Sequence, residues 1–269
     1  MSLFERIKRD SLRSPDSRGP IAYLLRKINP RKTIPDRHIG IFLTTQCNLN
    51  CFSCSALGMS PRPKVEHTSL EDIELFLEQM AYLHPYSYVT LIGGEPTAYP
   101  WLREACELVR KYGFKPTMIT NGYKIVPPEW FDYIIIDLHG DTNQQQIKKW
   151  KELLEESNIT WGMYKKQYHR DVRVALEDNI TKGARCSNWL KPLTLWKNIV
   201  YPCCNLMCVE WWNNDHSSTL ALKKAGWTTD NLNLSWTIKN WRRTLPPSVY
   251  RMCTIKCWKD ADKARWGKV

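Results

Sequence analysis

A group of three closely spaced cysteines constrains this chain more than any other feature of its sequence. Cys47, Cys51 and Cys54 form a C-x3-C-x2-C pattern directly after the apolar segment 39–43. This spacing brings three thiolates to one point, which suits an iron-sulfur cluster with one iron that no protein side chain ligates. An open iron of this kind indicates chemistry at the cluster and not electron transfer alone.

A structural zinc site is the alternative interpretation of the same loop. Such sites normally take four ligands in two close pairs, and neither a histidine nor a fourth cysteine lies near this loop. The spacing therefore favours an iron-sulfur cluster over zinc.

A second motif follows the next apolar segment, 88–92, and reads Gly93-Gly94-Glu95-Pro96. Two glycines at the end of a strand leave bare backbone at the carboxyl end of a sheet, where α/β folds build their ligand sites. A phosphate-binding loop would instead end in Gly-Lys-Ser or Gly-Lys-Thr. The motif therefore indicates a ligand site that is not a nucleotide phosphate loop.

Apolar periodicity predicts alternating strands and helices between residues 39 and 163. We expect strands over 39–43, 88–92, 116–120, 132–137 and 159–163, and helices over 69–83, 101–112 and 143–156. This alternation predicts an α/β fold with a parallel sheet and right-handed crossovers. Because a chain of 269 residues is short for a full eight-stranded barrel plus an extension, we expect a partial (β/α)6 barrel.

The two motifs together resemble the radical S-adenosylmethionine (SAM) superfamily. The resemblance implies that the three cysteines hold a 4Fe-4S cluster and that SAM chelates the fourth iron. It also implies that the segment 93–96, with Glu95, holds the methionyl amine. In this family one electron cleaves SAM and releases a 5′-deoxyadenosyl radical, which abstracts hydrogen from a substrate. A flavodoxin- or ferredoxin-type electron donor is then expected.

Other residues are assigned to SAM by the same resemblance. The family loop carries an aromatic residue just before the third cysteine, whereas here Ser53 holds that place and Phe52 precedes it. Asn121 and Asp137, at the ends of the third and fourth strands, resemble the polar residues that meet SAM in the family. The alternative is that Asn121 belongs to a simple turn and Asp137 to a helix cap.

Six of the ten cysteines lie from Cys186 onward. This part of the chain has a cysteine on each side of an expected hairpin and ends with a closely spaced cysteine pair. The order resembles the twitch subdomain, which is half of a SPASM domain, as in 2-deoxy-scyllo-inosamine dehydrogenase. The resemblance implies a second, auxiliary 4Fe-4S cluster, and a zinc site at the same residues is the alternative. A cluster ligated only by protein can accept an electron from a substrate radical, which favours oxidation of the substrate. Its expected ligands are Cys186, Cys204, Cys253 and Cys257, with Cys203 as a substitute for Cys204. Cys208 is assigned a structural role, and Cys106 is expected to be a buried apolar residue.

These features divide the chain into three expected units. They are a basic extension over 1–38, a radical SAM core over 39–184 and a twitch-like subdomain over 185–269. No secretory signal and no long apolar stretch is found, so we expect a cytoplasmic protein without membrane contact.

The expected substrate is a small polar molecule, phosphorylated or not. With 39 basic and 27 acidic residues and a net charge of +12, the chain attracts anions, so a nucleotide, a nucleic acid base or a peptide is the alternative. Candidate catalytic residues are Tyr164, Lys165 and Glu210. A non-enzymatic iron-sulfur or zinc protein is the alternative of another class.

Overall fold

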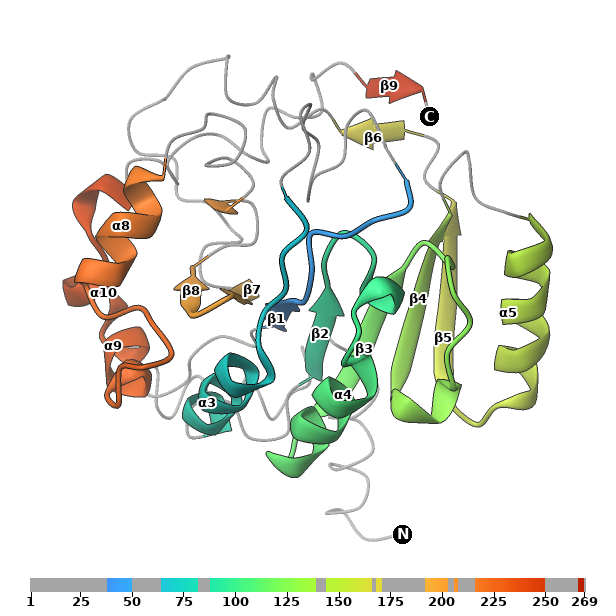
Figure 1. The fold of residues 1–269 in the computed structure, drawn as a ribbon, viewed down its shortest axis with the longest axis horizontal. Coiled ribbons are helices and arrows are strands. Elements are labelled where there is room, and N and C mark those ends of the chain that lie inside the picture. The colour runs from blue at the N-terminus through green and yellow to red at the C-terminus, as the bar shows by residue number, and fades with distance from the viewer. Residues whose placement is uncertain are drawn as a thin grey trace, which may run out of the picture.

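A seven-stranded sheet organises the chain in the computed structural model, with the strand order β5-β4-β3-β2-β1-β7-β8 (Figure 1). The structure describes residues 38–49, 64–81, 88–138, 144–165, 168–170, 192–202, 206–207, 216–249 and 266–268. The strands of this sheet are β1 (His38–Phe42), β2 (Tyr88–Ile92), β3 (Lys115–Thr120), β4 (Tyr133–Leu138), β5 (Thr160–Lys165), β7 (Pro192–Trp196) and β8 (Ile199–Tyr201).

Helices connect most of the consecutive strands. The helices are α3 (Leu70–Ala81), α4 (Leu102–Lys111), α5 (Gln144–Glu156), α8 (Ser217–Lys224), α9 (Leu234–Lys239) and α10 (Trp241–Thr244), with short 3-10 turns η1 (Pro96–Ala98) and η2 (Pro128–Trp130). Strands β1 to β5 pair in parallel with their neighbours. The predicted alternation and the parallel sheet are therefore confirmed, with boundaries that differ by only a few residues.

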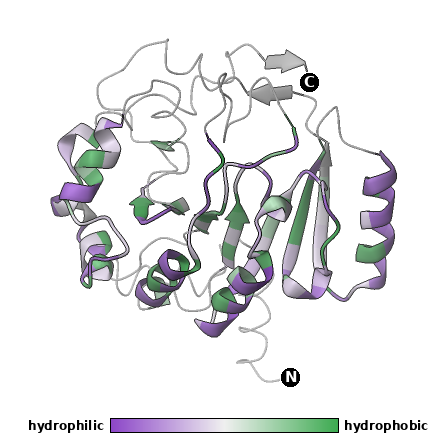
Figure 2. Cartoon of the chain, viewed as in Figure 1, coloured by the Kyte–Doolittle hydropathy of each residue, from purple (hydrophilic) through white to green (hydrophobic). Residues whose placement is uncertain are grey.

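Alternating side chains of the central strands and one side of each helix form the core. Ile39, Ile41, Val89 and Leu91 are fully buried in β1 and β2, and Trp150 of α5 is fully buried as well. Figure 2 shows that α3, α4 and α5 each carry both hydrophilic and hydrophobic residues, as expected for helices that cover a sheet. Burial of these apolar faces therefore fixes the strand ends against one another.

The first turn of α3 is capped by the side chains of Ser69 and Asp72. The Asp72 amide donates a hydrogen bond to Ser69 Oγ at 3.0 Å, and the Ser69 hydroxyl donates to Asp72 Oδ2 at 2.6 Å. This reciprocal pair satisfies an otherwise unpaired amide of the helix start. It explains why α3 begins at Leu70.

The hairpin expected in the C-terminal third is formed by β7 and β8, and it extends the same sheet. β7 pairs in parallel with β1 from His38↔Pro192 to Phe42↔Trp196, and β8 returns antiparallel to β7. Helices α8, α9 and α10 lie together beside this edge, and α5 lies beside the opposite edge (Figure 1). The boundary at residues 184 and 185 stays a prediction.

A separate two-stranded antiparallel sheet pairs β6 (Tyr168–Arg170) with β9 (Trp266–Lys268). The first described strand after β5, which is β6, therefore lies in this second sheet, and the six-stranded barrel stays a prediction. Across the described ranges, no helix is both long and apolar enough to span a bilayer.

Cys106 is buried in α4 with 2 % of its surface exposed, which confirms its expected role as an apolar core residue. Burial raises the pKa of its thiol, so the group stays protonated.

Gly122 follows β3 with φ 81°, and a Cβ there would lie 2.7 Å from Ile147 Cδ1. We expect Gly122→Ala to lower the free energy of unfolding by about 2–4 kcal/mol, because left-handed strain and a core clash add. Gly113→Ala is the matched control, since Gly113 has φ 80° and open space around its Cα. It should cost only about 1–2 kcal/mol. Denaturant unfolding of both variants measures the difference, and equal losses would contradict the packing argument.

Candidate functional site

The sequence motifs meet at the carboxyl ends of three neighbouring parallel strands. Segment 44–47 follows β1, Gly93-Gly94-Glu95-Pro96 follows β2, and Asn121 follows β3. Neighbouring parallel strands end at the same edge of a sheet, which is where α/β folds bind ligands. Fold topology therefore brings the first cysteine and the glycine motif together, as the sequence predicts.

Backbone hydrogen bonds join the first two of these segments beyond the end of the sheet. The Leu43 amide donates to Ile92 O at 2.7 Å, Gly94 N donates to Thr44 O at 2.7 Å, and Glu95 N donates to Gln46 O at 2.8 Å. At Gly93 a Cβ would lie 2.8 Å from Thr44 O. The first glycine of the motif is therefore required by the close approach of the cysteine-bearing chain.

Glu95 is buried, with 1 % of its surface exposed, and its carboxylate ties η1 to the end of β3. Oε1 accepts from the Thr97 amide at 3.0 Å, the Thr97 hydroxyl at 2.7 Å and the Thr120 hydroxyl at 2.6 Å. Oε2 accepts from the Asn121 amide at 2.8 Å. Burial raises the pKa of this carboxyl, and these hydrogen bonds oppose the rise. Its predicted contact with the methionyl amine stays a prediction.

Asn121 connects the end of β3 to the first cysteine of the loop. Its Nδ2 lies 2.9 Å from Asn48 Oδ1 and 3.8 Å from Cys47 Sγ. The Leu49 amide also donates to Cys47 Sγ at 3.4 Å. Because two N–H groups point at the sulfur, the site stabilises a thiolate and suits a cluster ligand.

A short antiparallel clamp closes the loop that carries the cysteines. The Thr45 amide donates to Glu66 O at 3.0 Å, and the Glu66 amide donates to Thr45 Oγ1 at 2.8 Å. The Thr45 hydroxyl also donates to Lys64 O at 2.8 Å. Residues before Cys47 are thereby paired with residues that follow the loop, so both ends of the loop are fixed.

The β7–β8 turn docks on this clamp through Thr68 and Lys197. The Thr68 hydroxyl donates to Phe42 O at 2.7 Å and accepts from the Lys197 amide at 3.0 Å. Lys197 Nζ also pairs with Glu66 Oε1 at 2.7 Å. Lys197 adopts φ 52°, an uncommon conformation for a residue other than glycine. The C-terminal hairpin therefore contacts the closing segment of the cysteine loop directly.

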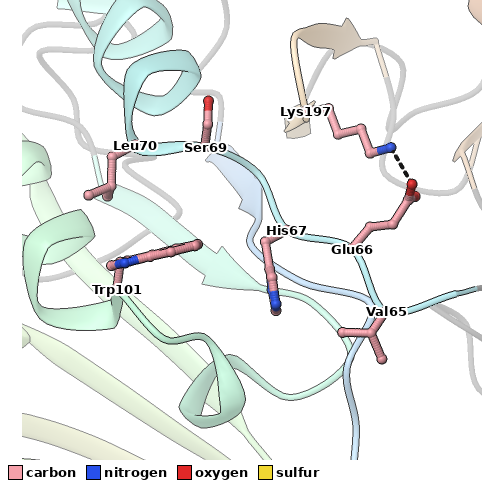
Figure 3. A pocket seen from close by; sticks show the side chains of 7 residues that line it. All are labelled: Val65, Glu66, His67, Ser69, Leu70, Trp101 and Lys197. Carbon is pink, nitrogen blue, oxygen red and sulfur yellow. Dashed lines mark hydrogen bonds and ion pairs between the residues drawn. The ribbon is translucent and has the colours of Figure 1, made fainter.

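A surface hollow lies beside this contact, as Figure 3 shows. It is lined by Val65, Glu66, His67, Ser69, Leu70, Trp101 and Lys197. In Figure 3 the Glu66–Lys197 ion pair lies on one side of the hollow and Trp101 on the other. The rings of His67 and Trp101 pack edge to face, with their centroids 5.8 Å apart. The hollow thus lies on the outer side of the clamp.

Several predicted site residues lie outside the described residues. They are Cys51, Phe52, Cys54, Cys186, Cys203, Cys204, Cys208, Glu210, Cys253 and Cys257. Within the described ranges no group of three or more His, Cys, Asp or Glu side chains is placed to hold a metal. Both 4Fe-4S ligand sets therefore stay predictions.

The remaining candidates lie at the ends of the outer strands. Asp137 is buried near the end of β4, and the register Asp137↔Tyr164 and Leu138↔Lys165 places the two β5 candidates beside it in the sheet.

The sequence analysis missed Thr97 and Thr120, which bind the Glu95 carboxylate. The available signal for these two contacts was a threonine two residues after Glu95 and a second threonine directly before Asn121 and Gly122.

Comparison with known proteins agrees with this arrangement. Residues 41–135 match the model of the Radical SAM superfamily. This part of the chain is therefore similar to a radical SAM domain. Two curated relatives are both named S-adenosylmethionine-dependent nucleotide dehydratase. The protein from Thermoplasmatales archaeon (strain ISO4-H5) is 29% identical over 94 residues, which cover 35% of this chain and 32% of the relative.

The second relative, from Flammeovirga pacifica, is 24% identical over 118 residues, covering 39% of this chain and 40% of the relative. The matched regions therefore span less than half of each relative. Both the family match and the enzyme names of these relatives support an enzyme.

Among solved structures, the chain resembles BtrN in complex with AdoMet and 2-DOIA. The TM-score is 0.55 at 15% identity, over 81% of this chain and 87% of BtrN. At this identity the likeness concerns the fold, which is an α/β fold with a mainly parallel sheet, similar to radical SAM enzymes.

The contribution of the Thr68 hydroxyl to the stability of the protein can be tested by mutation. We expect Thr68→Val to lower the free energy of unfolding by about 1–3 kcal/mol, because it removes the hydroxyl that donates to Phe42 O and accepts from the Lys197 amide. Thr117→Val is the matched control, since Thr117 is also buried and its hydroxyl has no partner among the described residues. That variant should be neutral or slightly stabilising. Equal losses in denaturant unfolding would contradict the assigned role of Thr68.

Proposed function

We propose that this protein is a radical SAM enzyme that abstracts hydrogen from a small polar substrate. The observation that carries the proposal is the junction of Cys47 with the Gly93–Pro96 turn, held by Gly94 N to Thr44 O and Glu95 N to Gln46 O. The proposed cysteine ligand and the glycine turn at the end of β2 thus lie side by side. A radical SAM enzyme needs this pairing of cluster ligand and SAM-binding turn.

Each residue has a proposed role in holding the two cofactors. Cys47, Cys51 and Cys54 would ligate the SAM-binding 4Fe-4S cluster, and Gly93, Gly94, Glu95 and Pro96 would bind the methionyl part of SAM. When bound, the cluster supplies the electron that cleaves SAM into methionine and the 5′-deoxyadenosyl radical. Phe52 and Asp137 are proposed SAM contacts as well. A flavodoxin- or ferredoxin-type protein is the proposed electron donor.

The chain itself would position SAM, limit water and restrain the loop. The clamp at Thr45 and Glu66 holds both loop ends, and Gly93 admits the Thr44 carbonyl at the site edge. Buried surroundings suit control of a reactive radical. Tyr164, Lys165 and Glu210 stay candidate catalytic residues. A second 4Fe-4S cluster at Cys186, Cys204, Cys253 and Cys257 would accept an electron from a substrate radical and so favour oxidation. Epimerisation and rearrangement are the other outcomes.

Anaerobic reconstitution tests the proposal most directly. We expect the wild-type chain to take up about eight irons if both clusters form, or about four if only the SAM cluster forms. It should release 5′-deoxyadenosine when dithionite and SAM are added. Cys47→Ala should abolish this release, because it removes one cluster ligand. Cys106→Ala is the control and should retain it, since Cys106 lies in the apolar core. Zinc uptake without SAM cleavage would overturn the enzyme assignment in favour of a metal-binding module.

A nucleotide is the second candidate substrate, favoured by the net charge of +12 and by the names of the curated relatives. A basic protein surface attracts phosphate groups, and salt screens that attraction. We therefore expect nucleoside triphosphates to bind the reconstituted protein in calorimetry, with affinity that falls several-fold from 50 to 300 mM salt. The uncharged nucleosides are the control. If nucleoside mono-, di- and triphosphates all fail to bind at low salt, a nucleotide substrate is rejected.

A further inference from the structure

The Asn121 side chain contacts the cysteine loop. Its amide nitrogen lies 3.8 Å from Cys47 Sγ and 2.9 Å from Asn48 Oδ1. A side-chain amide nitrogen carries two N–H groups, so one can point at the sulfur while the other bonds to Asn48. Asn121 is buried, with 7 % of its surface exposed. The Asn121 side chain is therefore mostly shielded from water, while its partners Cys47 and Asn48 are partly open to it.

The position of Asn121 is set by its neighbours. Its backbone amide donates to Glu95 Oε2 at 2.8 Å, and the preceding Thr120 donates to Glu95 Oε1 at 2.6 Å. The following Gly122 adopts φ 81°, and its amide donates to Thr120 Oγ1 at 2.9 Å. A buried carboxylate and a left-handed turn thus hold the backbone on both sides of Asn121. The Glu95 carboxylate acts on the loop through this residue.

We infer that Asn121 is a positioning residue that donates an N–H···S hydrogen bond to the Cys47 thiolate and thereby raises the reduction potential of the cluster. This inference rests on the proposed function, because it requires Cys47 to be a cluster ligand. Reduction adds negative charge to the cluster and its sulfurs, and an N–H donor stabilises that charge. Groups that hydrogen-bond to metal ligands also fix ligand orientation.

This role differs from the SAM contact that the sequence predicts for Asn121. A residue that only binds SAM would change SAM affinity and leave the potential of the SAM-free cluster unchanged. A donor to Cys47 would change that potential before SAM is added. The two roles therefore separate in a redox measurement without SAM.

The test uses the full chain, reconstituted without oxygen, and follows the electron paramagnetic resonance signal of the reduced cluster as the applied potential is varied. The signal that changes when SAM is added afterwards identifies the cluster at Cys47. Asn121→Leu keeps the approximate size and removes both N–H groups. Asn121→Asp keeps the shape and replaces the donor with an acceptor. Thr117→Val is the control, because Thr117 is buried in the same strand β3 and its hydroxyl has no partner among the described residues.

We expect both Asn121 variants to shift the midpoint potential to more negative values, with the larger shift in Asn121→Asp, while Thr117→Val stays at the wild-type value. If Asn121→Leu fails to fold, the Asp variant carries the test. Wild-type potentials in Asn121 variants that hold the full complement of iron would overturn this inference alone. A wild-type chain that takes up no cluster would overturn the proposed function, and this inference with it.

Discussion

The buried carboxylate of Glu95 is the interaction on which the rest of the site depends. Its two oxygens accept four hydrogen bonds from Thr97, Thr120 and Asn121, so the end of β2 and the end of β3 are fixed relative to each other. A buried carboxylate with this many donors is costly to disturb, because each lost bond leaves a buried polar group without a partner. Asn121, at the end of β3, is thereby held beside Cys47, which follows the neighbouring end of β1.

A second constraint links the core to the C-terminal third of the chain. β7 pairs with β1 along the full length of that strand, and the turn at Lys197 contacts Thr68 and Glu66. The strand that leads into the cysteine loop is therefore held on one side by β2 and on the other by the hairpin. A change in the hairpin would reach the loop through packed backbone and not through a flexible linker.

Much of the fold was predictable because its signals are local. Segment 88–92 is mostly apolar and is followed by two glycines, α4 has a helical apolar spacing, and Ser69 with Asp72 forms a cap within three residues. The candidate site was predictable as motifs, namely Cys47 and Gly93–Pro96. The clamp between Thr45 and Glu66, the role of Thr68 and the two threonines on Glu95 were not predicted. Most of these contacts join residues that are far apart in the chain, and the contact of Thr97 with Glu95, although local, involves a single polar residue that carries no periodic signal.

The sequence by itself determined the chemistry that is available: cysteines at cluster spacing, a glycine-rich strand end and a basic chain of 269 residues. It also determined the order of strands and helices, because apolar periodicity and turn residues act over short distances. Only the tertiary structure decided that β7 extends the core sheet beside β1 and that the Glu95 carboxylate faces protein donors. It alone decided that the Asn121 amide meets Cys47. These features arise from packing between distant segments, where burial removes water and makes the choice of hydrogen-bond partner decisive.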